Sequence, residues 1–177
     1  YADLNFALGK PTSSSGYENV GTKPEDATDG LLDTRWSSRF MDGEWLTIDL
    51  QNTYAVNRVK LYWETAYATH FDIQLSTDGV EYTTAYTATD AEGGTQDIIL
   101  PNGPTEARYV RIFCHQRNTS YGSSLYEVEV YGVRRPTALE NTYSEDNQLP
   151  HLILRNGQIY IMHKAKIYHI SGQLLQE

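Results

Sequence analysis

The stretch VNRVKLYWETAYATHFDIQLSTDG, residues 56–79, contains two runs in which apolar and polar residues alternate. The apolar positions recur at every second residue: Val59, Leu61, Trp63, Phe71, Ile73 and Leu75. This period of two is typical of β-strands with one buried face. The second run stops at Asp78-Gly79, a pair that favours a tight turn because glycine readily adopts a positive φ. The stretch therefore predicts two strands.

Short runs of the same kind continue on both sides of this stretch. WLTIDL, residues 45–50, alternates in the same way, and further strands are predicted at 83–87, 96–100, 109–114 and 125–131. The segment TKPEDA predicts a single helical turn, with Thr22 as its cap. No segment keeps a period of 3.6 residues. The chain is therefore predicted to be all-β, with an antiparallel β-sandwich over residues 1–134.

The composition changes after this domain. Residues 135–149 are polar and without periodicity, which predicts a linker. Residues 150–177 alternate again around Asn156-Gly157, a strong hairpin signal, and a second turn is expected at Ser171-Gly172. We therefore expect a small C-terminal β-hairpin appendage, which would be only marginally stable alone.

Charge and cysteine content exclude several classes of partner. The net charge of −9 argues against a nucleic acid or an anionic membrane, because both select clustered Lys and Arg. Cys114 is the single cysteine, so no internal disulfide can form, and the pattern around it predicts a core position. The chain begins at Tyr1 without a methionine or a signal peptide, and we expect it to be the C-terminal piece of a longer protein.

Several segments carry a family resemblance: NFALGKPTSSS (5–15), KPEDATDGLLDTRWSS (23–38), EWLTIDL (44–50), the opening stretch, RYVRIF (108–113) and TSYGSSLYEVEVYG (119–132). Together they resemble the coagulation factor V/VIII type C, or discoidin-like, domains. The branch that looks most similar is carbohydrate-binding module family 32 (CBM32) of bacterial glycan-degrading enzymes. The resemblance runs from about residue 4 to 133 and implies a discoidin-like jelly roll. The disulfide that joins the ends of the animal relatives is absent, which favours the bacterial branch.

The tail LILRNGQIYIMHKAKIYHISGQLL, residues 152–175, is similar to short C-terminal segments of exported Bacteroidetes proteins, some of them related to type IX sorting signals. This resemblance implies export to the periplasm, the cell surface or the medium. A stabilising hairpin without a sorting role explains the same pattern.

The family resemblance implies a structural Ca²⁺ in the loop TDGLLDTRWSS, residues 28–38. Carried onto this chain, the implied ligands are backbone carbonyls, carboxylates and one hydroxyl from Asp26, Asp29, Leu31, Thr34, Tyr126 and Glu127. Calcium prefers 6–8 oxygen ligands of this kind. Leu31 departs from the polar residue often found there, but only its carbonyl is required. The alternative is a metal-free turn in which Asp29 and Asp33 cap backbone amides.

The resemblance also implies a sugar site at one end of the sandwich. In relatives with similar motifs, residues matching Arg35, Glu64 and Tyr121 bind the terminal unit of a glycan, and Glu18 is the less surely placed fourth member. Guanidinium and carboxylate groups hydrogen-bond paired hydroxyls, while a phenol ring packs on the C–H face of a sugar. Neighbouring loops add Arg117, Asn118 and His70, the last without a second histidine at metal-ligand spacing. The alternative for Arg35 and Glu64 is an ordinary salt bridge.

We therefore expect a non-catalytic module that tethers a glycan-active enzyme, covalently attached upstream, to its substrate. The expected ligands are terminal galactose-type sugars, β-glucans or amino sugars. A glycosidase would need two carboxylates about 5–10 Å apart across a cleft. Glu64 with Glu18 or Asp42 could supply them, but so small a sandwich excludes water poorly, so no enzyme is expected. The remaining alternative is discoidin-type adhesion to protein or lipid.

Overall fold

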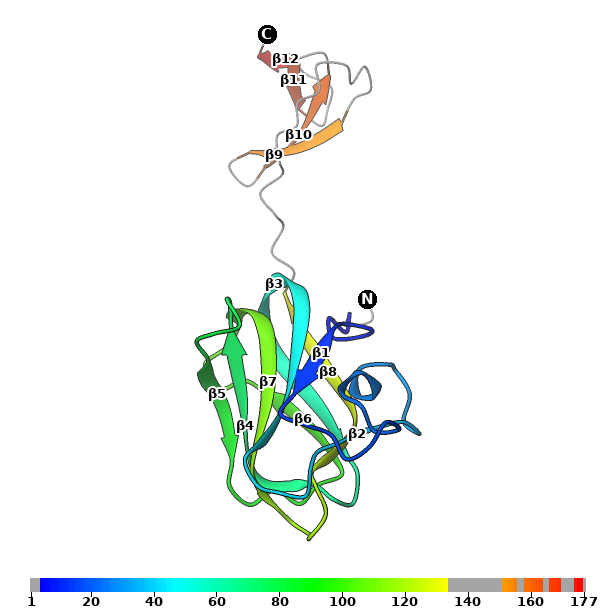
Figure 1. The fold of residues 1–177 in the computed structure, drawn as a ribbon. Coiled ribbons are helices and arrows are strands. Elements are labelled where there is room, and N and C mark those ends of the chain that lie inside the picture. The colour runs from blue at the N-terminus through cyan, green and yellow to red at the C-terminus, as the bar shows by residue number, and fades with distance from the viewer. Residues whose placement is uncertain (1–3, 134–150, 156–157, 164–165, 170–173, 177) are drawn as a thin grey trace. The chain divides into compact units, whose positions relative to one another are not determined.

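The computed structural model describes residues 4–133, 151–155, 158–163, 166–169 and 174–176. The chain divides into two compact units, residues 1–135 and 136–177 (Figure 1). The segment 135–149, interpreted as a linker, lies outside the described residues.

The first unit is built from eight strands: β1 (Thr12–Ser14), β2 (Trp36–Ser37), β3 (Glu44–Trp63), β4 (Ala68–Ser76), β5 (Thr83–Ala88), β6 (Thr95–Ile99), β7 (Thr105–Arg117) and β8 (Ser124–Val133). The described helical content is one 3₁₀ turn, η1 (Pro24–Ala27), so no described helix is long enough to cross a membrane. Thr22 was predicted to cap this turn, but the cap is Lys23, whose N–H is accepted by the carboxylate of Asp26.

Strand β3 runs through both layers of the sandwich. Its first part, residues 44–49, pairs with β1 and β7, and its second part, residues 58–63, pairs with β6 and β8. The first layer continues from β7 to β4 and β5, and the second from β8 to β2. All pairings are antiparallel, as Figure 1 shows for β5, β4 and β7. The predicted antiparallel β-sandwich is confirmed.

A bend in β3 allows one strand to serve both layers. Gln51 has a φ of 66°, a conformation that costs non-glycine residues free energy, and the register with β7 shifts between Asp49 and Tyr54. The sequence predicted separate strands at 45–50 and within 56–63. They are the two ends of a single 20-residue strand.

The core lies between the layers and is formed by the alternating apolar positions. Its largest fully buried side chains are Trp36, Phe71, Leu46, Ile48, Leu50, Leu61, Ile73, Leu100, Ile112, Leu125, Val56 and Val59. Cys114 is buried among them as predicted, and burial raises the pKa of its thiol to about 12.

The second unit is a four-stranded antiparallel sheet of β9 (His151–Arg155), β10 (Gln158–His163), β11 (Lys166–His169) and β12 (Leu174–Gln176), in the order β12-β11-β10-β9. Arg155 pairs with Gln158, as expected for a hairpin at Asn156-Gly157. A hairpin with a second turn was expected, and the described residues of this unit form four strands; the expected turn at Ser171-Gly172 lies outside the described residues.

Candidate functional site

Four loops meet at the end of the sandwich where β3 and β7 finish and β4 and β8 begin. Their common anchor is the pair Ser37 and Ser124, neighbours on β2 and β8 whose hydroxyls are 2.9 Å apart. The backbone carbonyl of Ser37 accepts the N–H of Glu18 at 2.8 Å, and the backbone carbonyl of Ser124 accepts the N–H of Glu64 at 3.0 Å. These two backbone contacts fix the loops that carry Glu18 and Glu64 to β2 and β8.

This anchor brings together the four residues for which the family resemblance implied sugar contact. Glu18 and Glu64 hydrogen-bond directly to the anchor pair, Arg35 directly precedes β2, and Tyr121 lies three residues before Ser124. Other exposed apolar side chains on these loops are Tyr17, Phe40 and Met41.

Glu64 is ionised and held in one orientation. Its two carboxylate oxygens accept hydrogen bonds from the Thr65 hydroxyl at 2.7 Å and the Ala66 N–H at 2.8 Å. Burial alone would raise the pKa of Glu64, but these hydrogen bonds and the nearby charge of Arg35 together lower it. A carboxylate accepts about four hydrogen bonds in total, so acceptor capacity remains for a ligand.

Arg35 has unused donor capacity. Its Nε is buried, and the described residues supply no hydrogen-bond acceptor for it. A buried unpaired donor is destabilising, so it needs a functional or structural explanation. In the described part of the chain, Arg35 and Glu64 do not form the salt bridge that was the structural alternative from sequence, although the two charges are close enough to interact.

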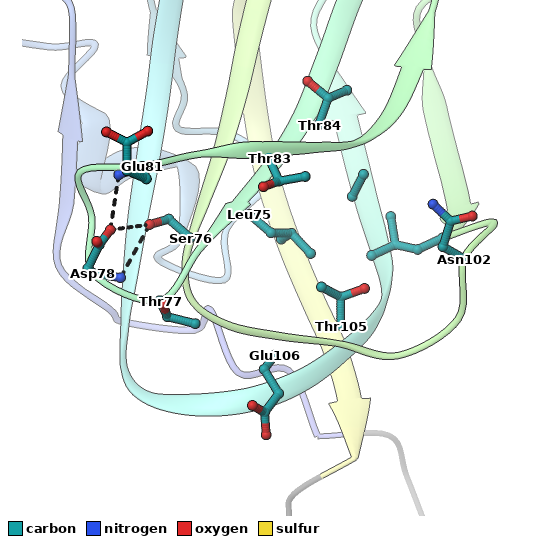
Figure 2. Close-up of a pocket in the computed structure, with 12 residues that line it drawn as sticks. Leu75, Ser76, Thr77, Asp78, Glu81, Thr83, Thr84, Asn102, Thr105 and Glu106 are labelled. Carbon is teal, nitrogen blue, oxygen red and sulfur yellow. Dashed lines mark hydrogen bonds between the residues drawn. The ribbon is translucent and has the colours of Figure 1, made fainter.

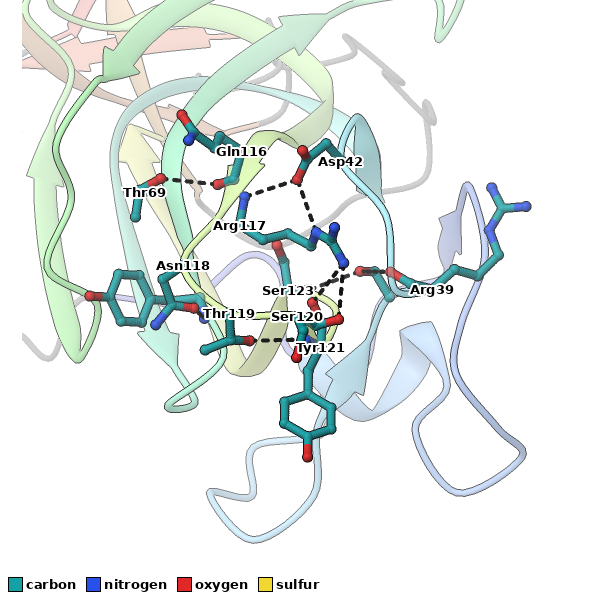
Figure 3. A network of polar contacts seen from close by, with 12 residues as sticks. Arg39, Asp42, Thr69, Gln116, Arg117, Asn118, Thr119, Ser120, Tyr121 and Ser123 are labelled. Carbon is teal, nitrogen blue, oxygen red and sulfur yellow. Dashed lines mark hydrogen bonds and ion pairs between the residues drawn. The ribbon is translucent and has the colours of Figure 1, made fainter.

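Tyr121 is exposed, with 62% of its surface accessible, and its ring meets that of Phe40 edge-to-face at 5.7 Å between centroids. Arg117 holds the backbone beneath it. Its guanidinium pairs with Asp42 at 2.9 Å and donates to the carbonyls of Ser120 and Tyr121, both at 3.2 Å (Figure 3). Arg117 was predicted to contact ligand; in this structure its donors position the Tyr121 loop.

Asn118 has a similar positioning role. Its side chain accepts the Tyr67 N–H at 2.8 Å and donates to the Thr65 carbonyl at 2.9 Å, which joins its loop to the one that carries Glu64. Gly122 completes the junction, because a Cβ at this position would collide with the backbone carbonyl of Ser38. The loop can pack this closely only with glycine.

The residues implied in calcium binding lie beside this end, where the loop 28–34 meets β8. Glu127 is 3% exposed; its Oε2 accepts the Gly30 N–H at 3.2 Å, while its buried Oε1 has no partner among the described residues. Asp29 accepts the Leu31 N–H at 2.9 Å and the Thr34 hydroxyl at 2.8 Å. Burial, and then the nearby carboxylates of Asp29 and Glu129, raise the pKa of Glu127 to about 8. An unpartnered carboxylate oxygen beside a second carboxylate fits a hard cation.

The other residues of the implied set lie in η1, in the loop 28–34 and on β8. The carboxylate of Asp26 accepts a hydrogen bond from the Lys23 N–H. The implied calcium ligand of Asp26 is its backbone carbonyl, which this contact does not involve. Leu31 and Thr34 lie in the loop, and Tyr126 precedes Glu127 on β8. Trp36 follows the residues 28–34 and is fully buried.

His70 does not join the sugar residues through any contact in the described part of the chain. Its ring packs against His115, with 4.4 Å between centroids. No second histidine lies at metal-ligand spacing from His70 along the chain, yet the fold places His115 against it. The two residues are 45 positions apart, and only the pairing of β4 with β7 brings them together.

The described unit also has a cavity of about 350 Å³ at the opposite end of the sandwich, where β4 ends and β5 and β7 begin (Figure 2). Thr83, Asn102 and Thr105 line it beside the Asp78 turn. None of the predicted site residues lines this cavity. The candidate sugar site is formed by loops at the other end of the sandwich.

Sequence reasoning missed the positioning contacts. Asp42 was considered only as a catalytic carboxylate, but Arg117 binds it and lowers its pKa by hydrogen bonding. The anchoring pair Ser37 and Ser124 carried no signal of its own, because serine is common in loops and strand ends. Only the pairing of β2 with β8 identifies it.

Comparison with known proteins identifies the family. The model of the F5/8 type C domain matches residues 10–128. Chitosan-binding module 2 of the chitosanase/glucanase from Paenibacillus sp. IK-5, solved with chitotriose, is 41% identical over 72% of this chain and 100% of its own, with a TM-score of 0.70. The CBM32 of AlyQ, solved with 4,5-unsaturated mannuronic acid, is 28% identical over 70% of this chain and 95% of its own, with a TM-score of 0.59.

One curated relative is a much larger protein. The polysaccharide lyase 8 family protein HylA of Enterococcus faecalis is 31% identical over 124 residues, which are 66% of this chain but only 9% of that protein. In fold and in sequence, the first unit is like carbohydrate-binding modules, which are non-catalytic domains. The match of the family model over most of the first unit shows that the chain belongs to the F5/8 type C domain family.

Proposed function

We propose that this chain is a non-catalytic module that binds the terminal unit of an amino-sugar chain through Glu18, Arg35, Glu64 and Tyr121. The observation that carries the proposal is the shared anchor at Ser37 and Ser124, from which all four residues extend at one end of the sandwich. The 41% identity to a chitosan-binding module supports the choice of amino sugar over galactose-type sugars and β-glucans.

The chemistry of the site favours a cationic sugar. Glu64 is kept ionised, and Glu18 supplies a second, exposed carboxylate at the same end. A protonated amine can donate charge-assisted hydrogen bonds to both. The Arg35 guanidinium then serves the neighbouring hydroxyls, and the exposed Tyr121 ring covers the apolar face of the sugar.

Such a site binds weakly on its own. Few contacts are buried and water competes for each hydroxyl, so we expect a dissociation constant on the order of 10⁻³ to 10⁻⁵ M. Attachment to a catalytic domain would raise the local concentration of substrate and offset this weakness. We propose that the module tethers a glycan-active enzyme in this way, as the occurrence of a related segment in a polysaccharide lyase suggests.

Calorimetric titration tests the sugar proposal directly. The chain should bind a trimer of β-1,4-linked glucosamine, and Glu64→Gln and Tyr121→Ala should each weaken binding at least tenfold with little change in melting temperature. Glu81→Gln, at the cavity on the opposite end, is the matched control and should bind as tightly as the unsubstituted chain. Undiminished binding by both site variants would remove these residues from the site.

We also propose that a Ca²⁺ ion stabilises the loop 28–34 against β8. The unpartnered Oε1 of Glu127 and the neighbouring Asp29 carboxylate support this assignment, and the carbonyls of Asp26, Leu31 and Tyr126 with Thr34 would complete the ligand set. The ion would supply positive charge to the buried Glu127 carboxylate and the exposed Asp29 carboxylate beside it, and would take no part in sugar chemistry.

A further inference from the structure

Three side chains with metal-binding atoms meet on the outer face of β4 and β7. His70 and Asp72 lie two residues apart on β4, and His115 lies opposite them on β7; one ligand atom from each falls within 4.8 Å of the other two. His115 Nε2 is 2.9 Å from Asp72 Oδ2. This cluster is distinct from the loop end and from the Glu127 loop, and neither proposal above uses it.

An irregularity in the strand pairing produces the cluster. His70 pairs with Gln116 and Phe71 pairs with Cys114, so His115 is an extra residue on β7 at this point. A bulge of this kind turns a side chain away from its regular direction. Here it places the His115 ring against both the His70 ring and the Asp72 carboxylate.

An ordinary ion pair accounts for only part of this arrangement. Asp72 and His115 would suffice for an ion pair. The His70 imidazole has no carboxylate partner among the described residues, and the two rings would repel each other if both were protonated. Asp72 is held from behind, because the Thr87 hydroxyl donates to its Oδ1 at 2.6 Å. Support of this kind is typical of metal-ligating carboxylates. Both histidines remain partly exposed, so an ion could reach them.

We propose that His70, Asp72 and His115 form a binding site for a divalent transition-metal ion such as Zn²⁺. Two imidazole nitrogens and one carboxylate oxygen are a common protein ligand set for such ions, with water in the remaining position. Imidazole ligands do not suit Ca²⁺, so the two ions select different sites. A bound ion would cross-link β4 to β7 beside the loops that carry Glu64 and Tyr121, and its binding requires no sugar.

The test is a Zn²⁺ titration of the full chain in competition with a chromophoric chelator. Three of the five histidines lie in the second unit, so the titration uses a background in which His151, His163 and His169 are glutamine. This background should bind one equivalent of Zn²⁺. Adding His70→Gln should weaken binding at least tenfold, and so should adding Asp72→Asn. The His70 side chain makes no hydrogen bond in the described structure, so its replacement removes a ligand without breaking the His115–Asp72 contact.

Two further readouts separate the site from nonspecific binding. Co²⁺ in the same background should give visible absorption bands that His70→Gln abolishes, and excess Ca²⁺ should not compete for the ion. Melting curves of each variant without metal verify that it is folded. Failure of the tail-substituted background to bind an equivalent of Zn²⁺, or equal affinity with and without His70→Gln, would overturn the proposal.

Discussion

At the scale of single residues, Arg117 holds the backbone of the loop that carries Tyr121. It links Asp42, Ser120 and Tyr121, so the position of the Tyr121 ring depends on it. We expect Arg117→Met to weaken binding of the glucosamine trimer about tenfold. Because the Asp42 partner is half exposed, the free energy of unfolding should fall by only about 1 kcal/mol or less. Calorimetry and chemical denaturation measure the two effects separately.

The matched control is Arg108, which forms a similar ion pair with Asp49 near the other end of β7. Arg108→Met should lower stability by a similar amount and leave sugar affinity unchanged. If both variants lost affinity equally, a general loss of stability would explain the result and the positioning role of Arg117 would be wrong.

At this scale the sequence was informative about residue types and less so about their roles. Trp63 and Cys114 were predicted to be buried from alternation alone, and they are. Arg117 and Asn118 were predicted to face a ligand, because exposed polar loop residues look alike in a sequence. Their contacts with backbone carbonyls and amides depend on loop conformation, which local patterns do not encode.

Among the elements, β3 is the one whose conformation is strained. Gln51 is the only non-glycine residue with a positive φ in the described part of the chain, and it lies at the bend between the two layers. Gln51→Gly should relieve this strain and stabilise the first unit by about 0.5–1 kcal/mol. Chemical denaturation gives the difference.

The neighbouring Asn52 provides the comparison, because it is also exposed but lacks a positive φ. Asn52→Gly should destabilise by a similar amount, since glycine there adds only unfolded-state entropy. A loss of stability in both variants would mean that the bend stores no relievable strain.

The loop 28–34 and β8 form a second pair of elements with a testable coupling. If Ca²⁺ joins them, chelation with EDTA should lower the melting temperature by roughly 5–10 °C, the effect expected when free calcium is about 100 times its dissociation constant. Glu127→Gln keeps an acceptor for the Gly30 N–H but removes the charge, so its melting should be insensitive to EDTA. Superimposable melting curves of the unsubstituted chain with and without EDTA would contradict the calcium proposal.

Alternation and turn residues were enough to predict most strands, and they failed where elements cross between layers. The runs at 45–50 and 57–63 looked separate because the polar segment between them interrupts the period, yet the backbone continues through a bend. The His70–Asp72–His115 cluster was invisible for a related reason. It depends on the register of β4 against β7 and on a bulge, neither of which is determined by spacing along the chain.

At the scale of the whole molecule, all residues of the candidate sugar and metal sites belong to the first of the two compact units. The family match and the similar solved modules cover the same part of the chain. Strong acidity is the other property of the molecule as a whole, with a net charge of −9. This charge argued against nucleic acids and anionic membranes as partners, and it favours a cationic ligand.

Acidity of the whole chain and the carboxylates of the site should both make amino-sugar binding sensitive to salt. Exposed charges are screened within about 10 Å at 0.1 M ionic strength and about 3 Å at 1 M. The dissociation constant for the glucosamine trimer should therefore rise several-fold between 0.05 and 0.5 M NaCl. The fully N-acetylated trimer carries no charge, so any binding that it shows should change less than twofold. Equal salt dependence for the two trimers, or tighter binding of the neutral one, would show that hydroxyl and ring contacts select the ligand, and a neutral sugar would replace the amino sugar as the proposed partner.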